Sequence, residues 1–181
     1  MAKAPVWVFD LDDTLHHATP HVFPHINRAM TEYIERHLSL DYAAATALRQ
    51  LYWKRYGATL LGLIRHHGVD PHHFLAQTHN FENLSSMLIT APALADTLKQ
   101  LPGRRIIFSN APKTYTHEVL RLTGLTPLFD AIYTVESFGF QPKPLRSGFQ
   151  KLLRKERIQP GQAIMIEDSL PNLVMAKRLG M

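Results

Sequence analysis

The spacing of hydrophobic and polar residues divides the chain into two patterns. In the first 15 residues, and again after about residue 90, short apolar runs alternate with amphipathic stretches. These patterns predict strands at residues 6–9, 105–108, 131–135 and 163–166, and helices at residues 93–101, 113–122, 144–155 and 171–179. Such alternation is typical of a parallel sheet covered by helices, so we predict an α/β fold with a doubly wound, Rossmann-like sheet.

A different pattern fills the segment between the first two predicted strands. From residue 20 to about residue 88, apolar residues recur at helical spacing, as at Val22, Ile26, Met30 and Tyr33. Further helices are predicted at residues 42–55, 59–66 and 71–77. We therefore predict a core domain of residues 1–18 and 90–181 and a helical cap domain of residues 19–89. Because ligands bind beyond the carboxyl ends of strands in open parallel sheets, an insert at that edge is expected to act as a lid; a helical elaboration away from any site is the alternative.

Composition restricts the chemistry that the chain can perform. It has 181 residues, of which 45% are hydrophobic and 19% charged, enough for one core and a modest insertion. The absence of cysteine excludes disulfides, thiolate metal sites and thiol catalysis. No apolar run approaches the roughly 20 residues of a membrane span, and the N-terminus lacks a secretion signal pattern, so we expect a cytoplasmic protein without a membrane partner.

The charge distribution gives little support to a nucleic-acid partner. The formal net charge is +5, and Lys and Arg gain affinity for nucleic acid by releasing phosphate counterions. These residues are scattered in short clusters, however, which favours solvated faces. The eleven histidines include adjacent pairs such as His66 and His67, whose side chains point about 100° apart on a helix and rarely chelate one ion.

Three carboxylates directly follow the first predicted strand, in the stretch DLDDT at residues 10–14. Asp10 is the first residue past the strand and Asp12 lies two residues further on, so both side chains and the intervening carbonyl can converge on one small volume. Clustered oxygen ligands suit Mg²⁺ better than they suit zinc. A polar turn in which an aspartate caps the next helix is the alternative.

Polar residues also follow each of the other predicted strands. Ser109 and Asn110 come after the second strand, Lys143 lies in FGFQPKP near the third, and Glu167 and Asp168 come after the fourth. Together with DLDDT, these strand ends supply a nucleophile, donors to phosphate oxygens, a cation and a metal cage. That combination favours phosphoryl transfer over four unrelated loops.

With these four motifs, the chain resembles the haloacid dehalogenase superfamily of phosphohydrolases. The resemblance implies a doubly wound core, a helical cap inserted after the first motif, and an aspartyl-phosphate mechanism. It assigns Asp10 as the nucleophile and Asp12 as the acid that protonates the leaving oxygen and then the base that activates water. Thr14 would help to orient Asp12.

The same resemblance assigns the remaining motif residues. Ser109 and the backbone of Asn110 would hold phosphate oxygens, and Lys143 would neutralise charge on the nucleophile and the phosphate. Mg²⁺ would bind the Asp10 carboxylate, the Asp12 carbonyl and Asp168, and Glu167 would act through water. The resemblance therefore places four residues at the metal: Asp10, Asp12, Glu167 and Asp168.

The second aspartate distinguishes reactions within the superfamily. A halide leaving group needs no acid and the dehalogenase branch lacks this residue, so Asp12 points to phosphate esters. A phosphonatase would need an imine-forming lysine in the cap, where Lys54 is the sole lysine and the motif otherwise differs.

A closer resemblance, to the pyrimidine 5'-nucleotidase branch, rests on HINRAMTEYIERHL, LYWKRYGATLLGL, FGFQPKP and IEDSLPNL. It implies nucleoside monophosphates as substrates and places Asn27 and Tyr56, among other cap residues, against the base or ribose. Three alternatives stay open: Tyr56 as a packing residue, another small substrate such as a sugar phosphate, and a non-catalytic module that binds a phosphorylated ligand.

The resemblance also implies a further strand and short helix after KRLGM at residues 177–181. Without that strand, we expect the hydrogen-bonding edge and apolar surface of the fourth strand to be exposed. A shortened chain and a partner that covers the gap are both compatible with this expectation.

Overall fold

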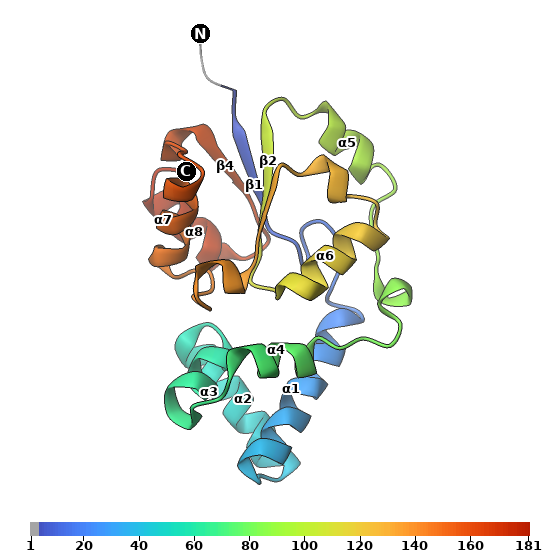
Figure 1. Cartoon of the computed structure of the whole chain (residues 1–181), viewed down its shortest axis with the longest axis vertical. Helices are drawn as coiled ribbons and strands as arrows, with labels where there is room; N and C mark the ends of the chain where they lie inside the picture. Colours follow the sequence, from blue (N-terminus) through green and yellow to red (C-terminus); the bar gives the residue numbers. More distant parts are fainter. Residues whose placement is uncertain (1–3) are drawn as a thin grey trace. The chain divides into compact units, whose positions relative to one another are not determined.

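The structure, a computed structural model, describes residues 4–181 and divides into two compact units. One unit comprises the chain up to Ala18 together with Leu88–Met181, and the other comprises Thr19–Met87. These are the core unit and the helical unit, whose ribbons are drawn in Figure 1.

The core unit is built on a four-stranded parallel sheet with strand order β3-β2-β1-β4. The strands are β1 (Val6–Phe9), β2 (Arg104–Phe108), β3 (Ala131–Tyr133) and β4 (Ala163–Ile166). The chain steps outward from β1 to β3 and then returns to place β4 on the other side of β1. Because the strand order reverses there, the carboxyl ends of β1 and β4 flank the position at which such sheets bind ligands.

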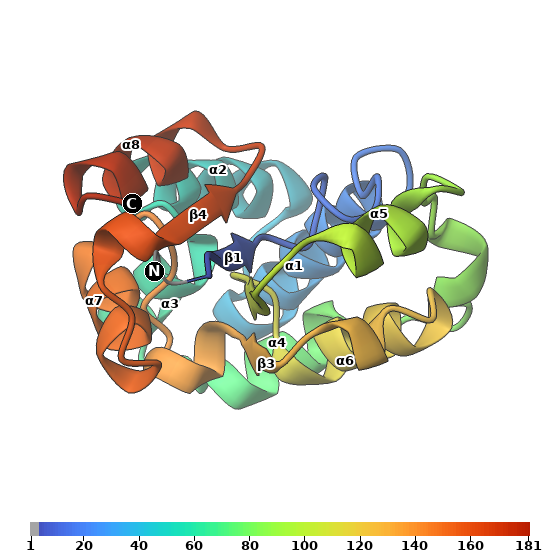
Figure 2. The same ribbon diagram turned by 90° about the horizontal axis from the view of Figure 1, so that it is seen from above.

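Helices cover both faces of this sheet, which confirms the predicted fold class. Figure 2 shows α5 (Leu94–Gln100) and α6 (Lys113–Leu122) on one face, and α7 (Arg146–Lys155) and α8 (Leu170–Arg178) on the other. Short 3₁₀ turns complete the connections of this unit: η2 (Thr126–Leu128), η3 (Val135–Phe138) and η4 (Pro160–Gln162). A further 3₁₀ turn, η1 (Leu84–Met87), ends the helical unit. None of the helices in the described part of the chain has the length and hydropathy needed to cross a membrane.

Successive side chains along the strands point to opposite faces of the sheet and pack on both. Val8 and Phe108 point to the face where Phe149 and Leu152 of α7 are buried, whereas Phe9 points to the opposite face and packs edge-on against Phe129 at 5.8 Å between ring centroids. Because both faces are buried, these strands read as continuous apolar runs rather than alternating ones.

The third strand is shorter than predicted. It ends at Tyr133 because a tight turn begins at Thr134. The Thr134 side chain accepts a hydrogen bond from the Ser137 amide, and the Ser137 hydroxyl accepts one from the Thr134 amide. Residues with high β propensity therefore leave the sheet where local capping offers their backbone groups other partners.

The edge formed by β4 matches the expectation of exposed apolar surface. β4 is the terminal strand of the sheet as described, and Ile164 is 39% exposed. On the adjoining helix α8, Leu170 and Val174 are also exposed.

The helical unit consists of α1 (Val22–Leu38), α2 (Tyr42–Tyr56), α3 (Thr59–His67) and α4 (Pro71–Thr78). Polar caps set the helix boundaries: Asp41 accepts from the Ala44 amide at 2.8 Å and Asp70 from the His72 amide at 2.9 Å. Gly57 and Gly68 end α2 and α3 in the left-handed conformation, which glycine adopts without strain. The short loops therefore follow from ordinary helix start and stop signals.

Close packing of α2 against α3 depends on the absence of a side chain at Gly62. A Cβ atom built there would lie 2.2 Å from Cγ of the buried Tyr52. The ring of Tyr52 cannot easily move away, because its hydroxyl pairs with Nε2 of His67 at 2.8 Å.

We therefore predict that Gly62→Ala destabilises the protein. Overpacking of this kind typically costs about 1–3 kcal/mol, which a thermal melt would record as a loss of several degrees. Gly161→Ala is the matched control, because the nearest neighbour of its new Cβ would lie 4.0 Å away. Equal melting temperatures for the two variants would contradict this account of the packing.

Candidate active site

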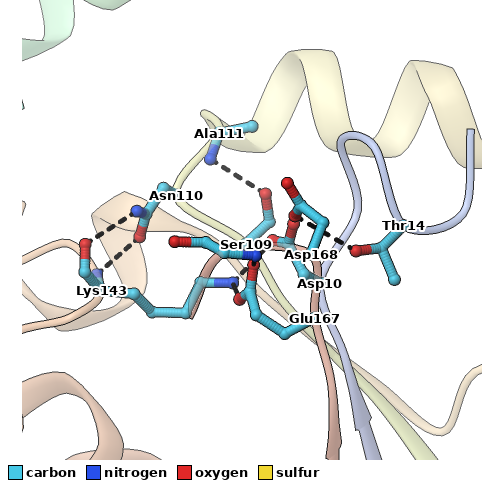
Figure 3. A network of polar contacts seen from close by, with 9 residues as sticks. Asp10, Thr14, Ser109, Asn110, Ala111, Lys143, Glu167 and Asp168 are labelled. Atoms are coloured by element: carbon cyan, nitrogen blue, oxygen red, sulfur yellow. Dashed lines mark hydrogen bonds and ion pairs between the residues drawn. The ribbon is translucent and has the colours of Figure 1, made fainter. Parts of the chain in front are cut away.

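The structure gathers polar side chains from the carboxyl ends of β1, β2 and β4 and from the loop before α7. Figure 3 shows Asp10, Ser109, Asn110, Lys143, Glu167 and Asp168 as one group. Asp10 follows β1 and its amide donates to the Ile166 carbonyl of β4 at 2.9 Å. Strand pairing therefore places the Asp10 side chain beside the residues that follow β4.

Lys143 connects two of the carboxylates. Its Nζ lies 2.6 Å from Asp10 Oδ1 and 2.6 Å from Glu167 Oε2, and the residue is only 2% exposed. A buried ammonium is stable when its hydrogen bonds are made to paired charges. The arrangement therefore holds the Asp10 carboxylate in a fixed orientation.

Asn110 positions the backbone of Lys143. Its Oδ1 accepts from the Lys143 amide at 2.7 Å, and its Nδ2 donates to the Lys143 carbonyl at 3.0 Å. From the sequence, only the backbone of Asn110 is predicted to contact the phosphate, and this side-chain contact is not. A side chain that pairs with backbone 33 residues away has no signature in spacing or periodicity.

Ser109 is held at the end of β2 with its hydroxyl hydrogen available. Its amide donates to the Tyr133 carbonyl at 2.9 Å, and its Oγ accepts from the Ala111 amide at 3.0 Å. Because that contact uses Oγ as an acceptor, the hydroxyl can donate to another oxygen, as the predicted role toward phosphate requires.

Two residues outside the predicted site contact Asp12. The Tyr115 hydroxyl donates to Asp12 Oδ1 at 2.6 Å, and His16 Nε2 lies 2.8 Å from the same oxygen. Burial, followed by the charge of Asp12, raises the pKa of the Tyr115 hydroxyl far above its usual range, so the hydroxyl remains a donor. Thr14, expected to orient Asp12, instead donates to Asp168 Oδ1 at 3.5 Å, the outer limit of a hydrogen bond.

Three carboxylates form a candidate metal site. Asp10, Glu167 and Asp168 each offer an oxygen, and these oxygens lie within 4.8 Å of one another. Burial raises the pKa of Asp10 to about 7, against the opposing effect of Lys143. Burial, and then Glu167, also raise the pKa of Asp168. Three clustered carboxylates, two of which, Asp10 and Asp168, have raised pKa values, fit a hard divalent ion such as Mg²⁺.

The two residues predicted for substrate contact in the helical unit are both engaged in local hydrogen bonds. Asn27 Oδ1 accepts from Nη1 of Arg49 at 2.6 Å, and the Tyr56 hydroxyl pairs with Nε2 of His66 at 2.6 Å. These partners fix the orientation of both side chains, and neither pairing was evident from the sequence.

The motif pattern agrees with a comparison against known protein families. The model of the family described as haloacid dehalogenase-like hydrolase matches residues 6–180. The chain belongs to the haloacid dehalogenase-like hydrolase family.

Individual relatives cover nearly the whole chain at low identity. Validoxylamine A 7'-phosphate phosphatase of Streptomyces hygroscopicus subsp. limoneus is 26% identical over 182 residues, which is 97% of this chain and 82% of that protein. Phosphate metabolism protein 8 of Saccharomyces cerevisiae is 23% identical over 197 residues; the match covers 97% of this chain but only 59% of the yeast protein.

Among solved structures, CbbY from Rhodobacter sphaeroides in complex with phosphate matches with a TM-score of 0.68 and 20% identity. The match covers 99% of this chain and 84% of that one. At this level of identity, the likeness shows the shared fold.

The carboxylate cluster predicts that Mg²⁺ binding strengthens as the pH rises. Below about pH 7, Mg²⁺ must displace the proton of Asp10, so its apparent affinity falls. At a fixed Mg²⁺ concentration, we expect a larger rise in melting temperature at about pH 8 than at about pH 5.5. Asp168→Asn should remove most of this rise, and an equal rise at both pH values would contradict the assignment of Asp10 as a ligand.

In metal-free protein the same carboxyl has the opposite effect. A folded-state pKa raised from 3.8 to about 7 means that the folded protein binds more protons over this range. Asp10 therefore contributes less stability as the pH rises through that window. The metal-free melting curve is the baseline against which the Mg²⁺ effect is measured.

Proposed function

We propose that this protein hydrolyses phosphate monoesters through an aspartyl-phosphate intermediate, with Asp10 as the nucleophile. The observation that carries the proposal is that the buried Lys143 holds Asp10 in place, while a second carboxyl, that of Asp12, lies two residues further along the chain. The first supplies an oriented nucleophile, and the second supplies an acid for an oxygen leaving group.

In the first step, an oxygen of Asp10 attacks phosphorus and the bond from phosphorus to the ester oxygen breaks. A proton moves from Asp12 to that oxygen, so the alcohol leaves neutral and Asp12 becomes a carboxylate. The Ser109 hydroxyl and the amide of Asn110 donate to the transferred group, and Lys143 offsets its negative charge.

In the second step, water attacks phosphorus, the bond from phosphorus to the Asp10 oxygen breaks, and one proton of the water passes to Asp12. Inorganic phosphate leaves, and both aspartates return to their starting states. Asp10, Glu167 and Asp168 would hold Mg²⁺, with the Asp12 carbonyl as a further ligand. When bound, the ion supplies positive charge that lets a phosphate dianion approach the carboxylates.

Within this reaction class, we propose pyrimidine nucleoside 5'-monophosphates as substrates, with Asn27 and Tyr56 contacting the base or ribose. Because Arg49 donates to Asn27 Oδ1, Asn27 retains its Nδ2 hydrogens for acceptors on a ligand, such as the carbonyl oxygens of a pyrimidine. A sugar phosphate is the alternative, supported by the phosphatase relative that is named for a 7'-phosphate.

We expect inorganic phosphate to be released from a panel of nucleotides and sugar phosphates in the presence of Mg²⁺. Asp10→Asn removes the nucleophilic charge and should reduce turnover to background. Asp12→Asn should slow turnover by about 10²- to 10⁴-fold, the usual range for acid-base assistance. Asp96→Asn, at a surface pair with Lys99, is the control. Near-normal turnover by Asp10→Asn, or stable binding of a phosphate ester without any turnover by the wild type, would refute this mechanism.

The substrate assignment is tested separately at Tyr56. Chemistry at Asp10 needs only the phosphate and its bridging oxygen, so a residue of the helical unit can act through the rest of the substrate. We expect Tyr56→Ala to lower kcat/KM for the preferred pyrimidine monophosphate more than for p-nitrophenyl phosphate. Tyr42→Ala, which alters a 60% exposed tyrosine of the same helix, should change neither. Equal losses on the two substrates would make Tyr56 a packing residue.

A further inference from the structure

Asp12 is held by a pair of buried side chains whose position the family motifs do not explain. Tyr115 is 2% exposed and His16 is 3% exposed. Both contacts end on Oδ1 of Asp12, at 2.6 Å from the Tyr115 hydroxyl and 2.8 Å from His16 Nε2. Oδ2 takes part in neither contact.

The loop after β1 is folded so that His16 returns to Asp12. Asp13 has φ of 57°, a left-handed conformation that aspartate tolerates better than most residues. The Asp13 side chain then accepts from the Ala18 amide at 2.7 Å, and the His17 amide donates to the Ile89 carbonyl at 2.8 Å. These contacts fix the backbone on both sides of His16.

Tyr115 reaches the same oxygen from a distant part of the chain. It lies in the first turn of α6, which begins just after Ser109 and Asn110 at the end of β2. Its hydroxyl bridges 103 residues of sequence to Asp12. The strand order brings β1 and β2 together, so the start of α6 faces the loop that carries Asp12.

A histidine at position 16 leaves one buried ring nitrogen unpaired among the described residues. Its Nδ1 is buried and has no hydrogen-bond partner among residues 4–181. Because Nε2 faces a carboxylate oxygen, which accepts, Nε2 carries the hydrogen. An apolar side chain would fill the space without leaving a buried nitrogen unpaired, so the contact to Asp12 is the feature that distinguishes histidine here.

We propose that His16 and Tyr115 are positioning residues that orient Asp12 as the acid of the reaction, an inference that rests on the proposed function. Two donors on Oδ1 fix the rotation of the carboxyl group. They also leave Oδ2 as the oxygen that carries the exchangeable proton, since a hydrogen on Oδ1 would meet both donors. After Oδ2 has given its proton to the leaving oxygen, the same two hydrogen bonds stabilise the carboxylate that remains.

This role predicts a dependence on the leaving group. The nitrophenolate of p-nitrophenyl phosphate leaves readily without a proton, whereas the alkoxide of benzyl phosphate needs one. Tyr115→Phe should therefore lower kcat/KM for benzyl phosphate by about tenfold or more and for p-nitrophenyl phosphate by less than about threefold. The parameter kcat/KM is used because it excludes hydrolysis of the phospho-enzyme, a step common to both esters.

Variants of His16 with side chains of similar volume provide a second test. His16→Gln retains a donor near the position of Nε2 and should stay close to the wild type. His16→Leu removes the donor and should reproduce the selective loss on benzyl phosphate. In an Asp12→Asn background, Tyr115→Phe should cause no further selective loss, because the group that it positions can no longer transfer a proton.

Tyr133→Phe is the matched control, because it also removes a buried hydroxyl that donates to a carboxylate, that of Glu156, in the same unit. It should leave the ratio of the two kcat/KM values unchanged. Equal losses on both esters in Tyr115→Phe, no loss on either, or a selective loss that persists with Asp12→Asn would each overturn the inference. A wild-type protein that hydrolyses neither ester nor any monophosphate of the panel would overturn the proposed function as well.

Discussion

The contact of the buried Lys143 ammonium with Asp10 and Glu167 is the interaction on which the site depends. Three charged groups from separate segments are largely removed from water, and each would be unstable there without the others. The sheet makes this arrangement possible, because adjacent β1 and β4 carry the two carboxylates to one edge. Asn110 then fixes the backbone of Lys143, so the end of β2 also contributes to the same contact.

Among residues 4–181, the charges of this cluster do not balance. One ammonium, that of Lys143, faces the carboxylates of Asp10, Glu167 and Asp168. Burial raises the pKa of Asp10 to about 7, because the ammonium only partly offsets the loss of hydration. A phosphate dianion would add to the imbalance, whereas a divalent cation would remove it. A divalent cation and a phosphate ester would therefore be complementary ligands for this set of residues rather than competing ones.

Sequence patterns predicted the fold and the proximity of the motif residues at one edge of the sheet because both depend on local information. Apolar runs define the strands, and polar residues directly after them are brought together by any parallel sheet. The side-chain role of Asn110 and the contact of Tyr115 with Asp12 could not be predicted, because they depend on tertiary proximity across 33 and 103 residues. His16 lies only four residues from Asp12, but its contact depends on the left-handed conformation of Asp13, which residue spacing does not reveal. Thr14 illustrates the same limit: its motif position was recognised, but its partner in the structure is Asp168.

Under the proposed mechanism, the reaction class depends on the surroundings of Asp12 more than on the nucleophile. A carboxylate held by Lys143 can attack either carbon or phosphorus, so Asp10 alone does not choose between a halide and an ester. A halide leaves without a proton, whereas an alcohol oxygen requires one. Two buried donors that fix one oxygen of Asp12 would have no use in the first reaction and a direct use in the second. The contacts of Tyr115 and His16 therefore favour ester hydrolysis on grounds independent of the motif itself.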